Sequence, residues 1–241
     1  LEGNNMKILY CASEANPFAG SGGLADVAGS LPHTLCRKGQ DCRIVMPLYG
    51  TIPQELKNQM NFITNFTVPV AWRHQYCGLF WARWNDCTYY FIDNEYYFNR
   101  NALYGFYDDA ERFAFFSRAV LEMIPYIDFK PDVINCNDWQ TGPVPVFLDT
   151  FRDNPFYQNM RSVITIHNLK FQGVWDVKTI QDITGLPSYY FTPDKLEAYK
   201  DANLLKGGLV YADAITTVSP TYAEEIKTQF YGEGLDGLLR L

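Results

Sequence analysis

Six short apolar runs alternate along the chain with longer segments of helical character. Several of these runs are continuously apolar and rich in β-branched residues, as is typical of strands buried on both faces. The predicted strands are Lys7–Ala12, Asp41–Met46, Tyr89–Ile92, Asp132–Cys136, Ser162–Ile166 and Ala214–Val218. The predicted helices are Leu24–Lys38, Asp109–Ile127, Gly142–Phe151, Asp194–Tyr211 and Pro220–Gln229. This alternation predicts an α/β fold with a Rossmann-like, doubly wound parallel sheet and helices on both faces.

The segment from Phe62 to Phe91 breaks this order because its apolar residues alternate more strictly. It holds Trp72, Phe80, Trp81 and Trp84. We expect an antiparallel hairpin inserted at the sheet edge or surface. A loop with a short helix is predicted over Lys178–Lys195, where two prolines interrupt regular structure. No repeat or flexible linker divides the chain, so 6–241 is predicted to be one domain and the polar residues 1–5 a tag or linker.

Composition excludes several classes of protein. The formal net charge is −7, which argues against non-specific binding to nucleic acid. No run of about 18 apolar residues occurs, so no membrane span is expected, and no signal peptide is recognised. The six cysteines are scattered and form no CxxC pair, and the three histidines show no zinc spacing. We therefore expect no metal site and a reducing, cytoplasmic setting.

A glycine turn, Gly20-Ser21-Gly22-Gly23, follows the first predicted strand and precedes the first predicted helix. Such a turn presents backbone N–H groups at a helix N-terminus, where the helix dipole favours an anion. Glycine also allows a phosphate or sugar to approach the main chain closely. The turn matches neither GxGxxG nor GxxxxGK[ST], so a turn without a ligand remains an alternative.

Polar residues follow four of the predicted strands. In open parallel sheets, ligands bind at the carboxyl ends of the strands, so these residues should converge on one rim. The candidates at this rim are Glu14, Asp26, Asp138, His167, Asn168, Gln172 and Ser219. Carboxylates and amides bind sugar hydroxyls in pairs, so the set suits a polyhydroxylated ligand. Two carboxylates and a histidine also leave glycoside hydrolysis open.

Each of these residues also has a purely structural interpretation. Asp138 could cap the helix that follows it, and His167 could be a hydrogen-bonded core histidine. Asn168 could form an Asx turn, and Ser219 is expected to cap a helix that has proline in its first turn. The position of Asp138 and His167 at two strand ends favours a functional role for this pair.

Six motifs, in order along the chain, together resemble one enzyme family. They are Gly22–Val27 after Ser13-Glu14, Tyr90–Phe98, Asp109–Phe113, Asn137–Trp139, Thr165–Leu169, and Tyr211–Tyr222. From Met6 to Leu241 the chain resembles the N-terminal half of bacterial glycogen synthases and plant starch synthases. The resemblance implies the N-terminal lobe of a two-lobed glycosyltransferase of the GT-B type.

The resemblance also implies an activity. Enzymes of this family transfer glucose from ADP-glucose, or sometimes UDP-glucose, to the non-reducing end of an α-1,4-glucan, with retention and without a metal or other cofactor. The setting would be the cytoplasm, or the plastid in a plant. The C-terminal lobe, which binds most of the donor, is absent from this sequence. The chain alone is therefore expected to be inactive or nearly so.

Site residues are carried over from the family's motifs. Asp138 and His167 match residues that contact the transferring glucose and the acceptor near the reacting carbon. The donor phosphates and sugar would lie against Ser21, Gly22, Gly23 and Asp26. Acceptor or sugar contacts are expected from Glu14, Tyr97, Arg100, Trp139, Gln140, Asn168 and Gln172.

Two positions depart from the family pattern. Gly20 stands where the family usually has a lysine that meets the donor phosphates, and Gln140 stands where it often has a histidine. Loss of one charge-assisted contact removes about 1.5–3 kcal/mol, and Arg100 is a candidate replacement cation. A non-catalytic α-glucan-binding module is therefore the alternative. A nucleotide-binding oxidoreductase is disfavoured, because the chain lacks GxGxxG and an acidic residue after its second predicted strand.

Overall fold

A computed structural model describes residues 5–241, so the predicted linker at 1–5 lies outside the described part except for its last residue. An eight-stranded sheet forms the centre, in the order β11-β7-β6-β1-β2-β5-β4-β3. Its strands are β1 (Lys7–Cys11), β2 (Asp41–Pro47), β3 (Asn61–Val70), β4 (Arg73–Trp84), β5 (Cys87–Asp93), β6 (Val133–Asn137), β7 (Arg161–Ile166) and β11 (Ala214–Thr217). A second sheet, in the order β8-β10-β9, contains β8 (Val174–Trp175), β9 (Glu197–Ala198) and β10 (Asp201–Asn203).

The six predicted strands all lie in the main sheet as parallel neighbours, from β11 to β5. The strands from β7 to β5 have central residues that are inaccessible to solvent, including Leu9, Ile44, Ile134 and Ile164, whereas the edge strand β11 is exposed at Ile215. This burial explains the continuous apolar runs, since a parallel sheet is covered on both faces. The prediction of an α/β fold with a parallel sheet is confirmed.

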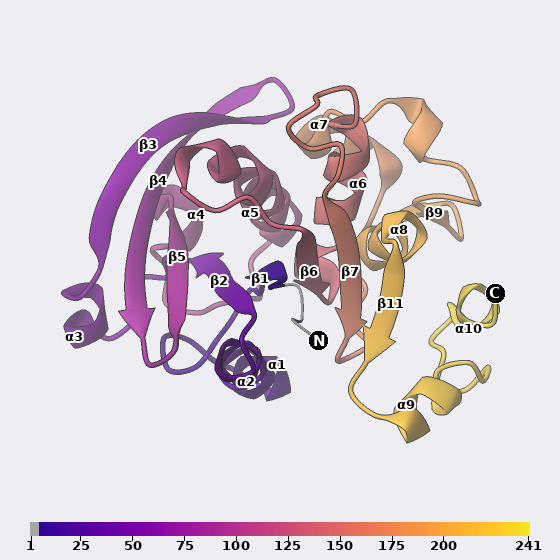
Figure 1. Ribbon diagram of the computed structural model, residues 1–241. Coiled ribbons are helices and arrows are strands. Elements are labelled where there is room, and N and C mark those ends of the chain that lie inside the picture. Colours follow the sequence, from indigo (N-terminus) through magenta and orange to yellow (C-terminus); the bar gives the residue numbers. More distant parts are fainter. Residues whose placement is uncertain (1–4) are drawn as a thin grey trace.

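Helices cover both faces of the sheet, as Figure 1 shows. They are α1 (Gly23–Ala28), α2 (Leu31–Arg37), α3 (Gln54–Lys57), α4 (Glu95–Phe98), α5 (Asp109–Met123), α6 (Pro143–Thr150), α7 (Val177–Thr184), α8 (Leu204–Tyr211), α9 (Pro220–Glu225) and α10 (Asp236–Leu239). The connection from β1 to β2 runs one way along the sheet, and that from β6 to β7 runs the other way. Because such crossovers are right-handed, α1 and α2 lie on the opposite face from α6.

The predicted hairpin is confirmed at one edge of the sheet (Figure 1). Strand β4 pairs antiparallel with both β5 and β3, and β3 is the last strand on that side. Phe62 and Trp81 remain exposed on this hairpin, whereas Leu79 is fully buried. Leu79 and Trp81 lie two residues apart and so share a face of β4. Position along the hairpin therefore decides which residues are buried, and strict alternation does not hold here.

Three helix predictions were wrong in extent. The segment Leu24–Lys38 is two helices, because Pro32 has no backbone N–H to donate to the preceding turn and so cannot extend the first helix. Asp194–Tyr211 is helical only from Leu204, where the side chain of Asn203 caps Lys206 N at 2.8 Å. The preceding residues instead pair as β9 and β10.

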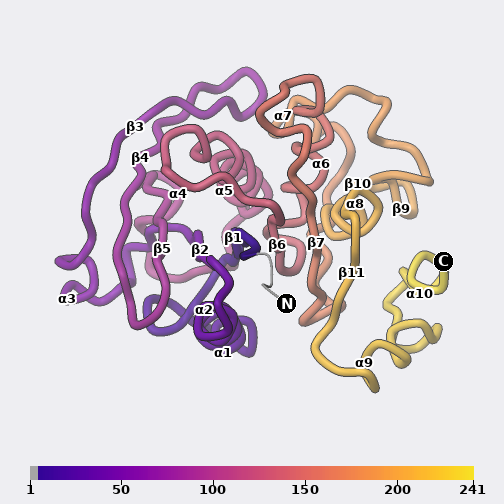
Figure 2. The backbone as a smooth tube through the Cα atoms, in the orientation of Figure 1, coloured from indigo at the N-terminus to yellow at the C-terminus, as the bar shows by residue number. Residues whose placement is uncertain are grey.

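The last predicted helix, Pro220–Gln229, ends at Glu225. The hydroxyl of Thr228 donates to the carbonyl of Glu225 at 2.6 Å, and this side-chain bond competes with helix continuation. The predicted cap is confirmed, since Ser219 Oγ accepts from Tyr222 N at 3.1 Å. Beyond β11, the chain runs outside the sheet edge through α9 and α10 (Figure 2). Within residues 5–241 no helix combines the length and apolarity that a bilayer crossing requires.

Candidate functional site

Strands β1 and β6 are neighbours at the point where the sheet's connections reverse direction. In doubly wound sheets the crevice at such a switch point is where ligands bind. The residues that leave these strands are Ser13 and Glu14 after β1, and Asp138 after β6. His167 follows β7, the next strand along. The topology therefore brings the two predicted catalytic residues to one rim.

The backbone of Asp138 is strained. Its φ of 58° and ψ of −170° lie in a region that residues other than glycine rarely adopt, at a cost of about 1–3 kcal/mol. The amide of Asp138 donates to the carbonyl of Thr165 at 3.0 Å. Its carboxylate Oδ1 accepts from the amides of His167 at 2.8 Å and Asn168 at 3.3 Å. Hydrogen bonds to the neighbouring strand thus hold the strained residue in place.

These bonds decide between the two interpretations of Asp138. Its side chain makes no capping bond to the turn Trp139–Thr141 that follows, so the capping interpretation is wrong. Burial raises its pKa from 3.8 to about 6, although the amides of His167 and Asn168 pull the pKa the other way. At neutral pH the group is therefore a carboxylate held in a poorly solvated place.

The ring of His167 is oriented by Asn137, the last residue of β6. Nε2 of His167 lies 2.8 Å from Oδ1 of Asn137. That oxygen also accepts from the hydroxyl of Tyr10 at 3.0 Å, and the amide nitrogen of Asn137 donates to the carbonyl of Cys11. Because Asn137 offers an oxygen, Nε2 of His167 carries the proton and Nδ1 remains an acceptor. Burial lowers the pKa of His167 to about 4, so the ring is neutral at neutral pH.

Glu14 holds the glycine turn through two hydrogen bonds. Oε2 of this buried carboxylate accepts from the amide of Ser21 at 2.6 Å and from its hydroxyl at 2.8 Å. Asp26 is engaged as well, since Asn16 donates to it at 2.7 Å. A Cβ placed on Gly22 or Gly23 would meet nothing within 4 Å. Open space therefore lies over these two exposed glycines, at the start of α1.

A groove of about 470 Å³ begins at Trp139, directly after Asp138. Its walls are aromatic and charged, and they include Trp139, Lys170, Phe171, Gln172, Trp175 and Glu233. The rings of Trp139 and Trp175 lie 5.4 Å apart between centroids. Aromatic faces beside polar groups suit the alternating apolar and hydroxyl surfaces of a sugar.

The absence of a side chain at Gly173 leaves the space that the ring of Trp139 occupies in this groove. A Cβ on Gly173 would lie 2.6 Å from Cε3 of the Trp139 ring, and the φ of Gly173 is +67°. The position therefore requires glycine on both steric and backbone grounds. Gln172, which also lines the groove, is held in place because its amide nitrogen donates to the carbonyls of Leu169 and Glu233.

A model of the starch synthase catalytic domain family matches residues 7–241. The chain belongs to this family. Glycogen synthases from Lachnospira eligens and Geobacillus thermodenitrificans are 58% and 56% identical to it, over 97% and 98% of the chain. Each match covers 49% of the relative. The chain thus spans about half the length of these synthases, and it corresponds to their N-terminal half.

The fold of a solved synthase agrees with this assignment. The catalytic domain of starch synthase IV from Arabidopsis thaliana, bound to ADP and acarbose, superposes with a TM-score of 0.90 at 29% sequence identity. The match covers 98% of the present chain and 49% of that chain. The expected glycogen and starch synthase family and the fold of its N-terminal lobe are therefore confirmed.

Two of the residues expected at the site of this synthase domain, Tyr97 and Arg100, are bonded to carboxylates within the protein, and a third, Gln140, has a buried side-chain oxygen. Tyr97 is fully buried and its hydroxyl donates to Glu111 at 2.5 Å. Arg100 is held by both carboxylate oxygens of Asp108, at 2.6 and 2.8 Å. Oε1 of Gln140 is buried without a hydrogen-bond partner in the described part of the chain.

Asn168 adopts the expected Asx turn. Its side-chain oxygen accepts from the amide of Lys170 at 3.1 Å. Its backbone amide meanwhile contacts Asp138, as described above. Asn168 therefore serves the geometry of the site through its main chain, and its exposed side-chain amide group remains available.

The lysine that is usual in the family does not fit this turn at position 20. A Cβ on Gly20 would lie 2.7 Å from Cβ of Ala25 and 2.8 Å from Oδ1 of Asn16. Any larger residue requires the turn to move. Arg100, the candidate replacement cation, is already paired with Asp108.

Tyr104 is a rim residue that the sequence did not reveal. Its hydroxyl lies 2.6 Å from Oγ of Ser13 at the end of β1. Burial raises its pKa, and the nearby charges of Glu14 and Asp138 add to that rise. Tyr104 sits in an irregular loop among other aromatic residues, so neither periodicity nor strand-end position singles it out. Among residues 5–241, no group of three or more His, Cys, Asp or Glu side chains is arranged to hold a metal ion.

Proposed function

We propose that the chain is the acceptor-side lobe of a retaining α-1,4-glucan synthase. The reaction is transfer of glucose from ADP-glucose to the non-reducing end of glycogen or a related glucan. Membership of the starch synthase catalytic domain family supports this proposal. The observation that carries it is the coupling of Asp138 to the segment that begins with His167, at the switch point of the sheet.

The chemistry of this pair suits glucosyl transfer. An oxocarbenium-like transition state carries developing positive charge, and a fixed carboxylate in a poorly solvated place stabilises it. Asp138 is such a carboxylate above about pH 6. Nδ1 of the neutral His167 ring can accept a hydrogen bond from a sugar hydroxyl. We assign both residues to the glucose that is being transferred.

The aromatic groove fits the acceptor glucan. It leads away from Asp138 along Trp139 and Trp175. Gln172 lines the groove, with its amide group bonded to Leu169, Glu233 and Asn203, and Tyr104 lies close to Glu14 and Asp138. Alignment of two sugars in a closed cleft supplies much of the rate enhancement and keeps water from hydrolysing the donor.

The open glycine turn fits the donor's diphosphate and sugar. The Arabidopsis starch synthase, whose fold this chain shares, is bound to ADP. ADP-glucose is accordingly the donor we propose here, with UDP-glucose as the alternative. Ser21 and Asp26 are already bonded within the turn, so Gly22 and Gly23 offer the closest approach.

Donor turnover requires a second lobe, as in relatives of about twice this length. We therefore propose that residues 1–241 alone are inactive or nearly so. Strand β11 ends the main sheet, and an apolar groove beside it is lined by Val218, Ala223, Ile226 and Leu238. This surface suits support of the second lobe. All six cysteines are free thiols, which favours a cytoplasmic setting.

The test measures glucan elongation from ADP-glucose by a protein that joins this chain to a second lobe from a close relative. Elongation that disappears in Asp138→Asn and falls strongly in His167→Ala supports the proposal. Absence of elongation in the parent protein, with the fold intact, contradicts it. Calorimetry of the 241-residue chain with maltoheptaose and with ADP-glucose should show saccharide binding and weak or no nucleotide binding.

Gly20 favours a second candidate, a non-catalytic α-glucan-binding module. The phosphate-binding cation expected at this position is missing, and the packing around Gly20 leaves no room for one. Such a module would bind maltoheptaose equally well but would transfer no glucose when joined to the second lobe. The elongation assay therefore separates the two candidates.

A further inference from the structure

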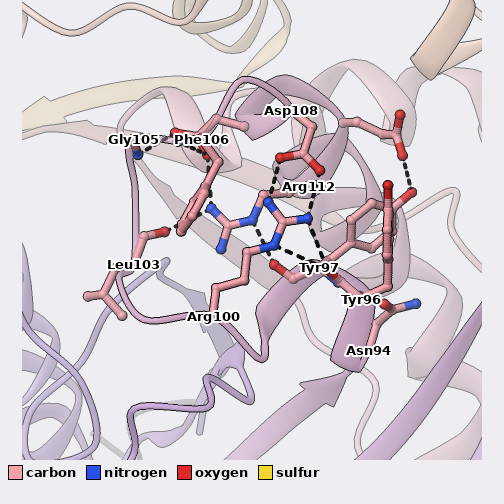
Figure 3. A network of polar contacts seen from close by, with 11 residues as sticks. Asn94, Tyr96, Tyr97, Arg100, Leu103, Gly105, Phe106, Asp108 and Arg112 are labelled. Atoms are coloured by element: carbon pink, nitrogen blue, oxygen red, sulfur yellow. Dashed lines mark hydrogen bonds and ion pairs between the residues drawn. The ribbon is translucent and has the colours of Figure 1, made fainter.

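We infer that Arg112, together with Asp109, is a positioning residue that holds Tyr104 at the rim of the acceptor site. The inference rests on the proposed function, because it concerns the acceptor side of that site. It concerns the loop 99–108 between α4 and α5, which lies between the motifs Tyr90–Phe98 and Asp109–Phe113. Figure 3 shows the polar network that fills this loop.

Arg112 is fully buried, although arginine is among the residues least often found in a protein core. Its Nε donates to the carbonyl of Tyr97 at 2.7 Å, and its Nη1 donates to the carbonyl of Leu103 at 2.9 Å. Nη1 also contacts Oδ1 of Asp109 at 2.9 Å. One guanidinium from the first turns of α5 thus binds the main chain at Tyr97, in α4 just before the loop, and at Leu103 within the loop.

Asp109 holds the next two residues of the same loop. Its Oδ2 accepts from the amide of Gly105 at 2.9 Å, and its Oδ1 accepts from the amide of Phe106 at 3.1 Å. The pair Arg112–Asp109 therefore fixes the main chain at Leu103, Gly105 and Phe106. Tyr104 lies between these three anchored residues.

A second arginine completes the clamp. Arg100 pairs with Asp108 through two hydrogen bonds and donates to the carbonyl of Tyr96. The ring of Phe106 lies 4.8 Å from the guanidinium carbon of Arg100 and 4.9 Å from that of Arg112. Figure 3 shows the two guanidinium groups close together, with Phe106 beside them. These hydrogen bonds and ring contacts together hold the loop in one conformation.

Burial of an ion pair is an expensive way to stabilise a fold, and apolar residues of similar size often do as well or better. A guanidinium offers five donors in a fixed plane, which suits the task of fixing several carbonyls at once. Nη2 of Arg112 is buried without a partner in residues 5–241, so stability alone does not explain the group. The bonds that Arg112 makes to the loop also place Tyr104, whose hydroxyl reaches Ser13 beside Glu14 and near Asp138.

The experiment is a double-mutant cycle on the 241-residue chain, with maltoheptaose as the probe. Calorimetry compares wild type, Arg112→Lys, Tyr104→Phe and the double variant. Asp109→Asn is a third single variant, because it removes one acceptor oxygen from the loop while it leaves the guanidinium in place. Arg118→Lys is the matched control on the same helix, where Arg118 pairs with Glu122 away from the loop.

We expect Tyr104→Phe and Arg112→Lys each to weaken maltoheptaose binding about tenfold, the change that loss of one ordinary hydrogen bond produces. The double variant should be no weaker than either single variant, because Arg112 acts through Tyr104. Hydrogen exchange at residues 99–108 should accelerate in Arg112→Lys and Asp109→Asn while the rest of the chain stays protected. Arg118→Lys should match wild type in both measurements.

Two results would overturn the inference without touching the proposed function. The first is a double variant whose loss is the product of the two single losses, about a hundredfold. The second is unchanged exchange of the loop in both Arg112→Lys and Asp109→Asn. A wild-type chain that binds no maltoheptaose would instead remove the proposed acceptor function itself, and the positioning role with it.

Discussion

Replacement of Asp138 by asparagine should make the protein more stable while it abolishes transfer. Asn keeps the side-chain oxygen that accepts from the amides of His167 and Asn168, so the rim retains its shape. It removes a negative charge that burial makes unfavourable. Most substitutions at buried positions destabilise, so a gain in stability is a demanding prediction.

The magnitude follows from the pKa of Asp138, which burial raises from 3.8 to about 6. Each pKa unit corresponds to 1.36 kcal/mol, so the ionised carboxylate costs the folded state about 3 kcal/mol. The folded state binds the proton more tightly than the unfolded state does. The penalty is therefore fully present above about pH 6 and disappears as the pH falls below about 4.

The assay is urea denaturation of the two proteins at pH 8, 7 and 5. The free energy of unfolding of Asp138→Asn should exceed that of wild type by up to about 3 kcal/mol at pH 8, and the difference should shrink at pH 5. Other titrating groups are shared by both proteins and cancel in the difference. A difference that stays constant with pH, or a variant less stable than wild type at pH 8, would refute the argument.

Asp108→Asn is the control for this experiment. Asp108 is buried to a similar extent, but its carboxylate pairs with Arg100 through two hydrogen bonds. Loss of that charge leaves the partly buried guanidinium without its partner. The control should therefore be destabilised at pH 8, in contrast to Asp138→Asn.

Three further predictions concern activity and packing. Transfer by the two-lobed protein should decline as the pH falls through about 6, because Asp138 must be ionised. His167, with a pKa of about 4, should contribute no change between pH 6 and 8. A pH–rate profile that is flat from pH 5 to 8 contradicts this prediction. Gly20→Lys should lower the free energy of unfolding by about 1–3 kcal/mol, because the new side chain clashes with Ala25 and Asn16. It should not tighten ADP-glucose binding. Thermal melts and calorimetry test the two effects, and an unchanged melting temperature would show that the turn adapts freely. Gly173→Ala should weaken maltoheptaose binding and shift tryptophan fluorescence, because its Cβ displaces Trp139; unchanged affinity and emission would exclude Trp139 from the acceptor groove.

Much of the fold could be predicted from local pattern. Strands β1 and β2 are recognisable because each contains a continuous apolar run, as expected of strands covered on both faces. Strands β6 and β7 are recognisable from their β-branched apolar residues, although polar residues interrupt them. Asp194–Ala202 could not be assigned by pattern, because its short strands form only by pairing with each other and with β8. A two-residue strand carries too little periodicity to be recognised.

The site divides in the same way. Asp138 and His167 could be found because each follows a recognisable strand, and the rule for parallel sheets places such residues at one rim. Tyr104 could not be found, because it lies in a loop whose path depends on Arg112 and Asp109. Tyr97 lies in a family motif and Arg100 follows it closely, yet they are bonded to Glu111 and Asp108.

The sequence by itself determined the layered α/β architecture, the antiparallel hairpin and the strand ends that carry the polar residues. Those features depend on local periodicity and on the few ways in which buried strands can be covered. Only the tertiary structure decided which polar groups face the cleft and which are used within the protein. That choice depends on hydrogen bonds between residues far apart in the chain, such as Asp138 to His167 and Tyr104 to Ser13, and no local pattern encodes such bonds.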